Sequence, residues 1–407
     1  MVSCQTTTLS NGLRMIHLHS ESPVAYCGFA VNAGTRDERQ DEFGLAHFIE
    51  HLLFKGTRQR RSCHILNRME QVGGELNAYT TKEETFIYAT FLSGDFERAA
   101  ELLSDLVFHS NFPEKEIEKE RAVVLDEINS YKDNPSELIY DEFENMLFQG
   151  HEIGHHILGE APSLNRFTQP SCLSFFSRNY LPGNMVFFSM GNIPFAKIIH
   201  WLKKYAGGES AGTTALHRIS PHGISAGKRQ LEMESYQAHV MIGSRGYSLL
   251  DEKRPALYLL NNILGGPGMN SRLNLSLREK YGYVYNVESN LTTYTDTGVF
   301  SIYFGCDQKH VEKCIALVHK ELKGLRNKIL TDKQLHAAKK QLKGQLGISN
   351  ENSENVALSM GKVFLHKNKY YSLEDNYNLI DTITSRELWE AANDIFDEKR
   401  LSQLIIL

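Results

Sequence analysis

Residues 44–53 read Gly-Leu-Ala-His-Phe-Ile-Glu-His-Leu-Leu. The apolar residues recur at helical spacing, which predicts a helix from about 43 to 54. Inside it, His47, Glu50 and His51 form the pattern H-x-x-E-H. At about 3.6 residues per turn these three positions share one face of a helix, so both imidazoles and the carboxylate project together. The stretch therefore predicts a polar, metal-binding face on an otherwise apolar helix.

Two neutral imidazoles on adjacent turns suit Zn²⁺, which also needs a third protein ligand and an open position for a water molecule. Glu50, beside that water, is then the candidate general base. The alternative is an ordinary polar helix face with two surface histidines. A glutamate and two histidines in an apolar helix would be costly without a partner, which favours the metal site.

The third ligand is expected on a second helix, predicted from Pro113 to about Tyr131. Glu120 and Glu127 are seven residues apart and lie on one face of it, while Asp126 and Glu116 are alternatives by chemistry alone. We favour Glu127 because it follows the apolar residues 122–125, where we expect the helix to be more buried.

The composition excludes several classes of protein. The chain has 407 residues, enough for two or three domains, and a formal charge of −5, which argues against binding to nucleic acid. No apolar run is long enough to cross a membrane, and residues 1–20 resemble neither a signal nor a transit peptide. We therefore expect no membrane partner and a cytoplasmic protein of bacterial type.

The chain also reads as an internal duplication. Residues 206–229 are rich in Gly, Ser, Thr and Pro and are the best linker candidate, which predicts one domain over 1–205 and another over 230–407. Residues 44–53 align without a gap on 255–264, and the helix that starts at Pro113 aligns on one that starts at Thr331. This register replaces the four candidate zinc-site residues in the second half by Tyr258, Asn261, Asn262 and Gln345. The second half is therefore not expected to bind zinc in this way.

Several stretches together resemble one enzyme family. They are Gly34-Thr-Arg-Asp-Glu38, 44–51, Phe54-Lys-Gly-Thr57, Gly73-Gly-Glu-Leu-Asn-Ala-Tyr-Thr80 and 118–128. The sequence resembles the inverzincin peptidases of the pitrilysin and insulin-degrading family (M16), in the half-length branch that includes the β-subunit of the mitochondrial processing peptidase. The resemblance implies an α+β fold of the LuxS/MPP-like metallohydrolase type, with two homologous domains, each a mainly antiparallel sheet flanked by helices.

The resemblance also implies roles for single residues. In the family the distal zinc ligand follows the second histidine by about 76 residues, which selects Glu127 independently, and Glu120 falls on the glutamate that supports the site. Residues 74–80 are similar to the family's substrate-binding edge strand, with an ordinary hairpin as the alternative. The candidate substrate-binding residues are Gly74, Leu76, Asn77, Ala78 and Tyr79.

In the second half, Arg278 and Tyr285 are spaced like the family's Arg/Tyr pair, which reaches substrate and helps to stabilise the oxyanion. His151, His155 and His156 could suggest a second metal site, but nearby glycines favour a loop without a metal.

The expected function is a zinc endopeptidase, with one zinc ion per chain and a substrate that is a peptide or an unfolded polypeptide segment. The family arrangement implies a homodimer enclosing a chamber, in which Arg278 and Tyr285 act on the partner chain's site. The alternatives are a non-catalytic assembly subunit and a processing-type subunit that needs a second, different M16 chain.

Overall fold

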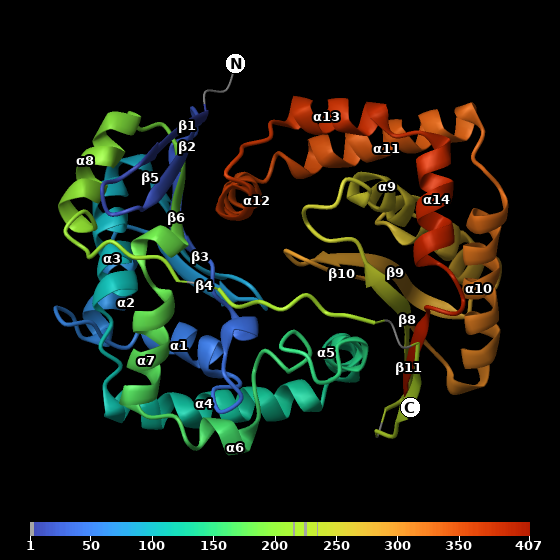
Figure 1. Ribbon diagram of the computed structural model, residues 1–407, viewed down its shortest axis with the longest axis horizontal. Coiled ribbons are helices and arrows are strands. Elements are labelled where there is room, and N and C mark those ends of the chain that lie inside the picture. Colours follow the sequence, from blue (N-terminus) through green and yellow to red (C-terminus); the bar gives the residue numbers. More distant parts are fainter. Residues whose placement is uncertain (1–3, 215, 224–225, 234) are drawn as a thin grey trace. The chain divides into compact units, whose positions relative to one another are not determined.

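The computed structural model describes residues 4–214, 216–223, 226–233 and 235–407, which form two compact units (Figure 1). The first unit consists of Met1–Asn129, His155–Arg218 and Asn350–Tyr371, and the second of Ser130–Gly154, Ile219–Ser349 and Ser372–Leu407. Each unit thus contains a short segment from the other half of the chain.

The first unit is built on a six-stranded sheet in the order β1-β2-β6-β3-β5-β4. The parallel pair is β2 with β6, and the other neighbours are antiparallel. The strands are β1 (Cys4–Thr8), β2 (Arg14–His19), β3 (Val24–Val31), β4 (Glu75–Thr80), β5 (Thr85–Leu92) and β6 (Met185–Gly191). Strand β4 lies at an edge of this sheet.

Alternate residues of these strands face opposite sides, so the sheet needs a cover on both faces. One face packs against the core that includes α1, α3, α7 and α8. The other face packs against α12, which comes from the second half of the chain. The helices of this unit are η1 (Thr35–Asp37), α1 (Leu45–Leu53), α2 (Ser62–Glu70), η2 (Ser93–Asp95), α3 (Phe96–His109), α4 (Glu114–Lys132, which continues into the second unit), α6 (Ala161–Leu164), α7 (Gln169–Asn179), η3 (Pro182–Asn184), α8 (Phe195–Tyr205) and α12 (Ser353–Lys367).

The second unit repeats this plan with five strands in the order β7-β11-β8-β10-β9. Its strands are β7 (Lys228–Leu231), β8 (Ala238–Gly246), β9 (Val284–Thr293), β10 (Gly298–Cys306) and β11 (Ser402–Ile406). Order and strand directions match β2-β6-β3-β5-β4 of the first unit, with one parallel pair and antiparallel neighbours elsewhere. The α+β fold class is confirmed, and β9 is the counterpart of the edge strand β4.

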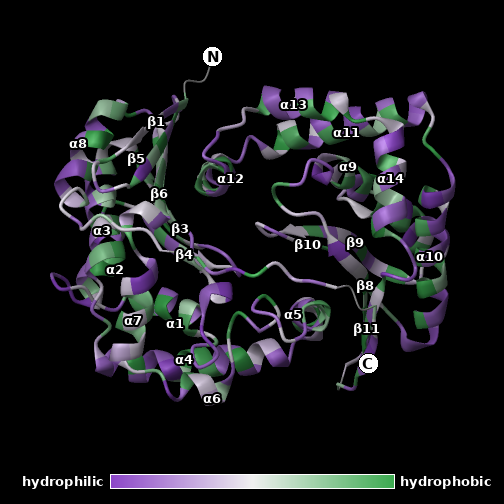
Figure 2. Ribbon diagram, in the orientation of Figure 1, coloured by the Kyte–Doolittle hydropathy of each residue, from purple (hydrophilic) through white to green (hydrophobic). Residues whose placement is uncertain are grey.

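The helices of the second unit divide in the same manner. Helix α5 (Pro135–Leu147), from the first half of the chain, packs on one face of its sheet. The others are α9 (Arg254–Gly265), the π-helical turn η4 (Asn274–Lys280), η5 (Gln308–His310), α10 (Val311–Asn327), α11 (Asp332–Ser349), α13 (Leu373–Thr382) and α14 (Ser385–Ile395). Helices such as α10 and α14 carry hydrophobic and hydrophilic residues along their whole length, as helices with one buried face do (Figure 2).

Residues 206–229, predicted as a linker, contain no helix or strand in their described part before β7 begins at Lys228. At one point this segment is anchored, because the nearly buried guanidinium of Arg218 pairs with Asp37 at 2.8 Å. Among the described residues, no helix is long and apolar enough to cross a membrane.

Candidate metal centre

Helix α1 carries the H-x-x-E-H pattern with its apolar side turned into the core. Leu45, Phe48, Ile49 and Leu52 are fully buried, which fixes the rotation of the helix about its axis. That rotation leaves Glu50 and His51 half-buried and keeps His47 only 7% exposed.

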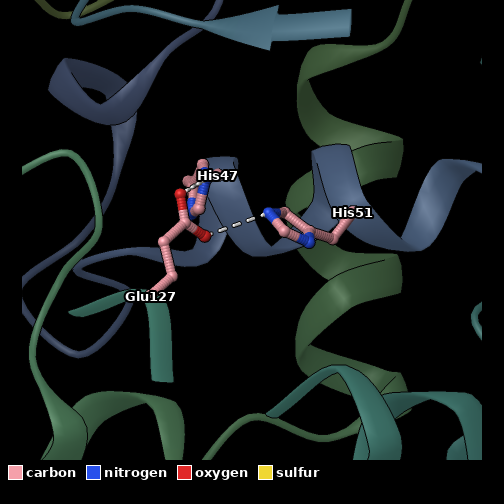
Figure 3. Close-up of side chains that lie close together, drawn as sticks. All are labelled: His47, His51 and Glu127. Carbon is pink, nitrogen blue, oxygen red and sulfur yellow. Dashed lines mark ion pairs between the residues drawn. The ribbon is translucent and has the colours of Figure 1, made fainter. Parts of the chain in front are cut away.

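Glu127 of α4 reaches both histidines (Figure 3). Its Oε1 lies 3.7 Å from His47 Nε2, and its Oε2 lies 3.4 Å from His51 Nε2. In the described part of the chain, these three residues form the group whose His, Cys, Asp or Glu ligand atoms come close enough to hold a metal ion, all within 4.8 Å of one another.

The donor set fits zinc. Ligand bonds of about 2.1 Å in a tetrahedron place neighbouring ligand atoms about 3.4 Å apart, close to the separations from Glu127 to the two imidazoles. Burial, with the nearby His51, lowers the pKa of His47 to about 4, so its ring is neutral and able to bind a metal near pH 7. Two imidazole nitrogens and one carboxylate also leave room for a fourth, exchangeable ligand.

Glu120, about two helical turns before Glu127 on α4, supports this group. Its Oε2 lies 3.3 Å from His51 Nδ1 and its Oε1 lies 2.7 Å from Lys55 Nζ, while its side chain is only 8% exposed. A carboxylate on the second ring nitrogen fixes the orientation and tautomer of a ligand histidine. Glu127 is 42% exposed, so our expectation that α4 is more buried at Glu127 than earlier in the helix is wrong.

Glu50 lies between this group and the sheet. Burial raises the pKa of its carboxyl, against the opposing effects of Thr80 and His51. Its Oε2 has no hydrogen-bond partner in the described part of the chain. A carboxyl group with a raised pKa and a free oxygen is suited to take up and release a proton.

The candidate substrate-binding residues lie on or next to β4, which packs beside α1 and, among the described strands, pairs only with β5. Gly74 immediately precedes the strand and packs against Phe91 and Met69. Within the strand, Asn77 is exposed and Leu76, Ala78 and Tyr79 are half-buried. An edge strand with this exposure leaves backbone groups available for an added strand.

Arg278 and Tyr285 lie together in the second unit, on η4 and β9. The guanidinium carbon of Arg278 is 5.7 Å from the centre of the Tyr285 ring, and Tyr285 is 84% exposed. Both side chains are therefore available for a further partner.

Lys55 is a site residue that the sequence reasoning missed. It stands four residues after His51, and an i,i+4 neighbour of a candidate ligand is a signal that could have drawn attention to it.

Comparisons with known proteins agree with this geometry. Residues 14–161 match Insulinase (Peptidase family M16), and residues 166–342 match the Peptidase M16 inactive domain. An uncharacterized zinc protease of Streptomyces coelicolor is 31% identical over 404 residues, covering 97% of this chain and 87% of the relative. The uncharacterized zinc protease YmxG of Bacillus subtilis is 31% identical over 400 residues, covering 98% and 97%. The chain belongs to peptidase family M16.

A solved structure described as a peptidase M16 inactive domain from Pseudomonas fluorescens has the same fold as this M16 chain. It superimposes with a TM-score of 0.92 at 21% identity, covering 100% of this chain and 98% of that one. The segment that matches the inactive domain contains Tyr258, Asn261 and Asn262, the counterparts of the histidines and the glutamate of α1 in our alignment.

Proposed function

We propose that this M16 chain is a zinc-dependent endopeptidase that cleaves peptides or unfolded polypeptide segments. The observation that carries the proposal is the convergence of His47, His51 and Glu127, with Glu50 on the same helix and the edge strand β4 beside it. The zinc-protease names of full-length relatives support it.

His47, His51 and Glu127 would hold one zinc ion per chain, and Glu120 would keep the His51 ring in place. When bound, the metal would supply Lewis-acid activation of water and of the scissile carbonyl. Glu50 takes the proton of the attacking water as its oxygen bonds to the carbonyl carbon. It then delivers that proton to the amide nitrogen as the C–N bond breaks.

The substrate would bind as an added strand on β4. Thr81 N–H donates to Glu84 O at the β4–β5 turn, and the alternation of antiparallel pairing then leaves the backbone groups of Leu76, Ala78 and Thr80 facing away from β5. Only an extended segment can pair with these groups, which selects peptides and unfolded chains.

The metal and Glu50 can be tested together. We expect about one zinc per purified chain, cleavage of a quenched fluorescent peptide that stops with chelator, and a loss of about 10³-fold in kcat for Glu50→Gln with zinc retained. Glu118→Gln, at an exposed position of α4, is the control and should cleave normally. A chain without stoichiometric zinc, or cleavage that survives Glu50→Gln, would contradict the proposal and favour a non-catalytic subunit.

We further propose that the enzyme is a homodimer in which Arg278 and Tyr285 act at the partner chain's metal centre. Both residues are donors suited to a developing oxyanion. A mixture of the Glu50→Gln and Arg278→Ala variants tests this, because a mixed dimer then holds one complete site, and we expect recovery of about a quarter of the wild-type rate after subunit exchange. If the pair acts within its own chain, the mixture stays inactive; activity only with a second, different M16 chain would indicate a processing-type subunit.

A further inference from the structure

The N-terminal end of α1 cannot be capped by its own N-cap residue. That residue is Gly44, which has no side chain and a φ of +94°. A Cβ atom there would lie 2.8 Å from Gly159 Cα and 2.8 Å from Leu158 O, so no larger residue fits. The first N–H groups of a helix have no partners within the helix, and here they need a partner from elsewhere.

Glu38 is that partner. Gly44 N–H donates to Glu38 Oε2 at 2.9 Å, and Ala46 N–H donates to Glu38 Oε1 at 2.7 Å. The side chain of Glu38 is fully buried, with 0% exposed. Both oxygens of one carboxyl group thus hold the first turn of the helix that carries His47, Glu50 and His51, at the end where the helix dipole favours a carboxylate.

Glu38 is itself held by His155, which lies in the loop between α5 and α6. His155 Nε2 lies 2.9 Å from Glu38 Oε2, and the His155 ring stacks on Phe43 with ring centres 4.0 Å apart. Lys82, in the turn between β4 and β5, donates its Nζ proton to His155 O. This line of contacts leads from the edge strand's own hairpin to the start of α1.

A second set of contacts, through η1, also joins the β4–β5 turn to the first turn of α1. Glu83, the next residue of the hairpin turn, pairs with Arg36 at 2.7 Å, and both side chains are buried. Thr35 N–H donates to Thr81 O at 3.1 Å. Residues 34–38 therefore contact the β4–β5 turn through Thr35 and Arg36 and the first turn of α1 through Glu38.

We infer that Glu38 is a positioning residue that sets the place of α1 relative to the substrate strand β4, and thereby the place of the metal-binding histidines and of Glu50. The inference rests on the proposed function for its effect on catalysis. Glu38 acts through the N-terminal turn of α1 and not by contact with the metal or the substrate.

Glu38→Gln tests the inference because it keeps the size of the side chain but turns one of the two acceptors into a donor that faces an N–H group. Glu42→Gln is the matched control. Glu42 is a buried carboxylate of the same loop, but its side chain accepts from Arg39 N–H and pairs with Arg178, with no hydrogen bond to an α1 N–H.

In Glu38→Gln we expect faster hydrogen exchange over residues 44–53 of the metal-free chain, zinc affinity about 10-fold lower, and kcat about 10-fold lower with KM within about twofold. Glu38→Asp, which keeps a carboxyl group, should recover part of each change. Glu42→Gln should leave exchange at 44–53, zinc affinity and kcat near the wild-type values.

Equal behaviour of Glu38→Gln and Glu42→Gln in all three measurements would overturn the inference. If Glu38→Gln does not fold, unchanged exchange and zinc affinity in Glu38→Asp would overturn it. The exchange measurement needs no activity, so a wild-type chain that neither binds zinc nor cleaves peptides refutes the proposed function separately.

Discussion

The helix beside each edge strand makes the sharpest comparison between the two units. In the first unit α1 packs beside β4, and in the second α9 packs beside β9, with the same strand order behind each. The two helices differ in one side chain of the polar face, which is Glu50 in α1 and its counterpart Asn261 in α9. Glu50 Oε2 and Asn261 Oδ1 both lack a hydrogen-bond partner in the described structure. The amide of Asn261 donates to Ser289 O at 3.0 Å, and the backbone O of Asn261 accepts from Ser289 Oγ at 3.2 Å. The two helices therefore differ in the group they present, which is a carboxyl group on α1 and an amide on α9.

The difference teaches that the scaffold and the chemistry are separable. Asn261 ties its helix to the edge strand by an amide, at the place where the first unit holds the carboxyl group of Glu50 beside Thr80 of its own edge strand. A carboxyl group can take up and release a proton there, and an amide cannot. Tyr258, the counterpart of His47, is 45% exposed and supplies no metal-binding nitrogen. The repeated fold is kept in the second unit without the side chains that a metal centre needs.

The largest expected effect comes from exchanging the third ligand for its counterpart. Glu127→Gln replaces the carboxylate by the amide that Gln345 presents in the second unit, and we expect zinc affinity to fall by at least about 100-fold and cleavage to disappear. Zinc content and peptide cleavage, measured on the same preparation, check this.

The reverse change, Gln345→Glu, is the control. We expect it to leave zinc at one ion per chain, because Tyr258 and Asn262 provide no imidazole. A second bound zinc in Gln345→Glu would show that the second unit can also form a metal site, which would contradict the comparison.

Much of the first unit could be predicted from the sequence. The helices predicted around 43–54 and 113–131 are confirmed as α1 and α4, and residues 74–80, which resemble an edge strand, contain β4. Local periodicity determines these elements, since each has one buried side and clear end signals. The spacing within H-x-x-E-H determines that its three side chains share a face.

Long-range placement could not be predicted in this way. The amphipathic patterns of α5 and α12 show that each helix buries one side, but not that it packs on the sheet of the unit built mainly from the other half of the chain. Glu38 and His155 are far apart in sequence, so no local pattern marks their contact. The burial of Glu120, by contrast, could have been predicted from the sequence, because Ile117, Val124 and Ile128 place it on the apolar face of α4.

A smaller effect is expected at the edge strand. Ala78→Pro removes a backbone N–H that faces away from β5, so peptide binding should weaken and kcat/KM should fall about 10-fold with little change in Tm. Asn77→Pro removes an N–H that faces β5 and should lower Tm instead. Kinetics and thermal unfolding of both variants check the assignment; equal kcat/KM for Ala78→Pro and wild type would contradict strand addition on β4.

The comparison extends to α12 and α5, each of which packs on the sheet of the unit built mainly from the other half of the chain. Besides its apolar contacts with the first sheet, α12 is held by Glu84, which lies 2.6 Å from His366 Nε2 and 3.3 Å from Lys362 Nζ. In the second unit, Tyr140 of α5 donates to Glu288 of β9 at 2.6 Å, and Tyr294 donates to Glu144 of α5 at 2.8 Å. Both attachments combine an ion pair with a phenol hydrogen bond, because Tyr88 also donates to Glu354 of α12 at 3.1 Å and Arg229 of β7 pairs with Glu142 of α5 at 3.0 Å.

The smallest effect on activity at neutral pH, and the clearest on acid stability, is expected at Glu84. Burial alone would raise its pKa, but His366, Lys362 and Thr81 together lower it from 4.5 to about 2. A carboxyl group with a lowered pKa in the folded state contributes stability above the unfolded pKa and loses it as the pH falls toward the folded pKa. The contribution is on the order of 3 kcal/mol above pH 4.5 and vanishes toward pH 2. Hydrogen-exchange protection factors should fall for α12 between pH 5 and pH 3 in the wild type, and less in Glu84→Gln. An equal fall in the wild type and in Glu84→Gln would contradict the assignment of this pH dependence to Glu84.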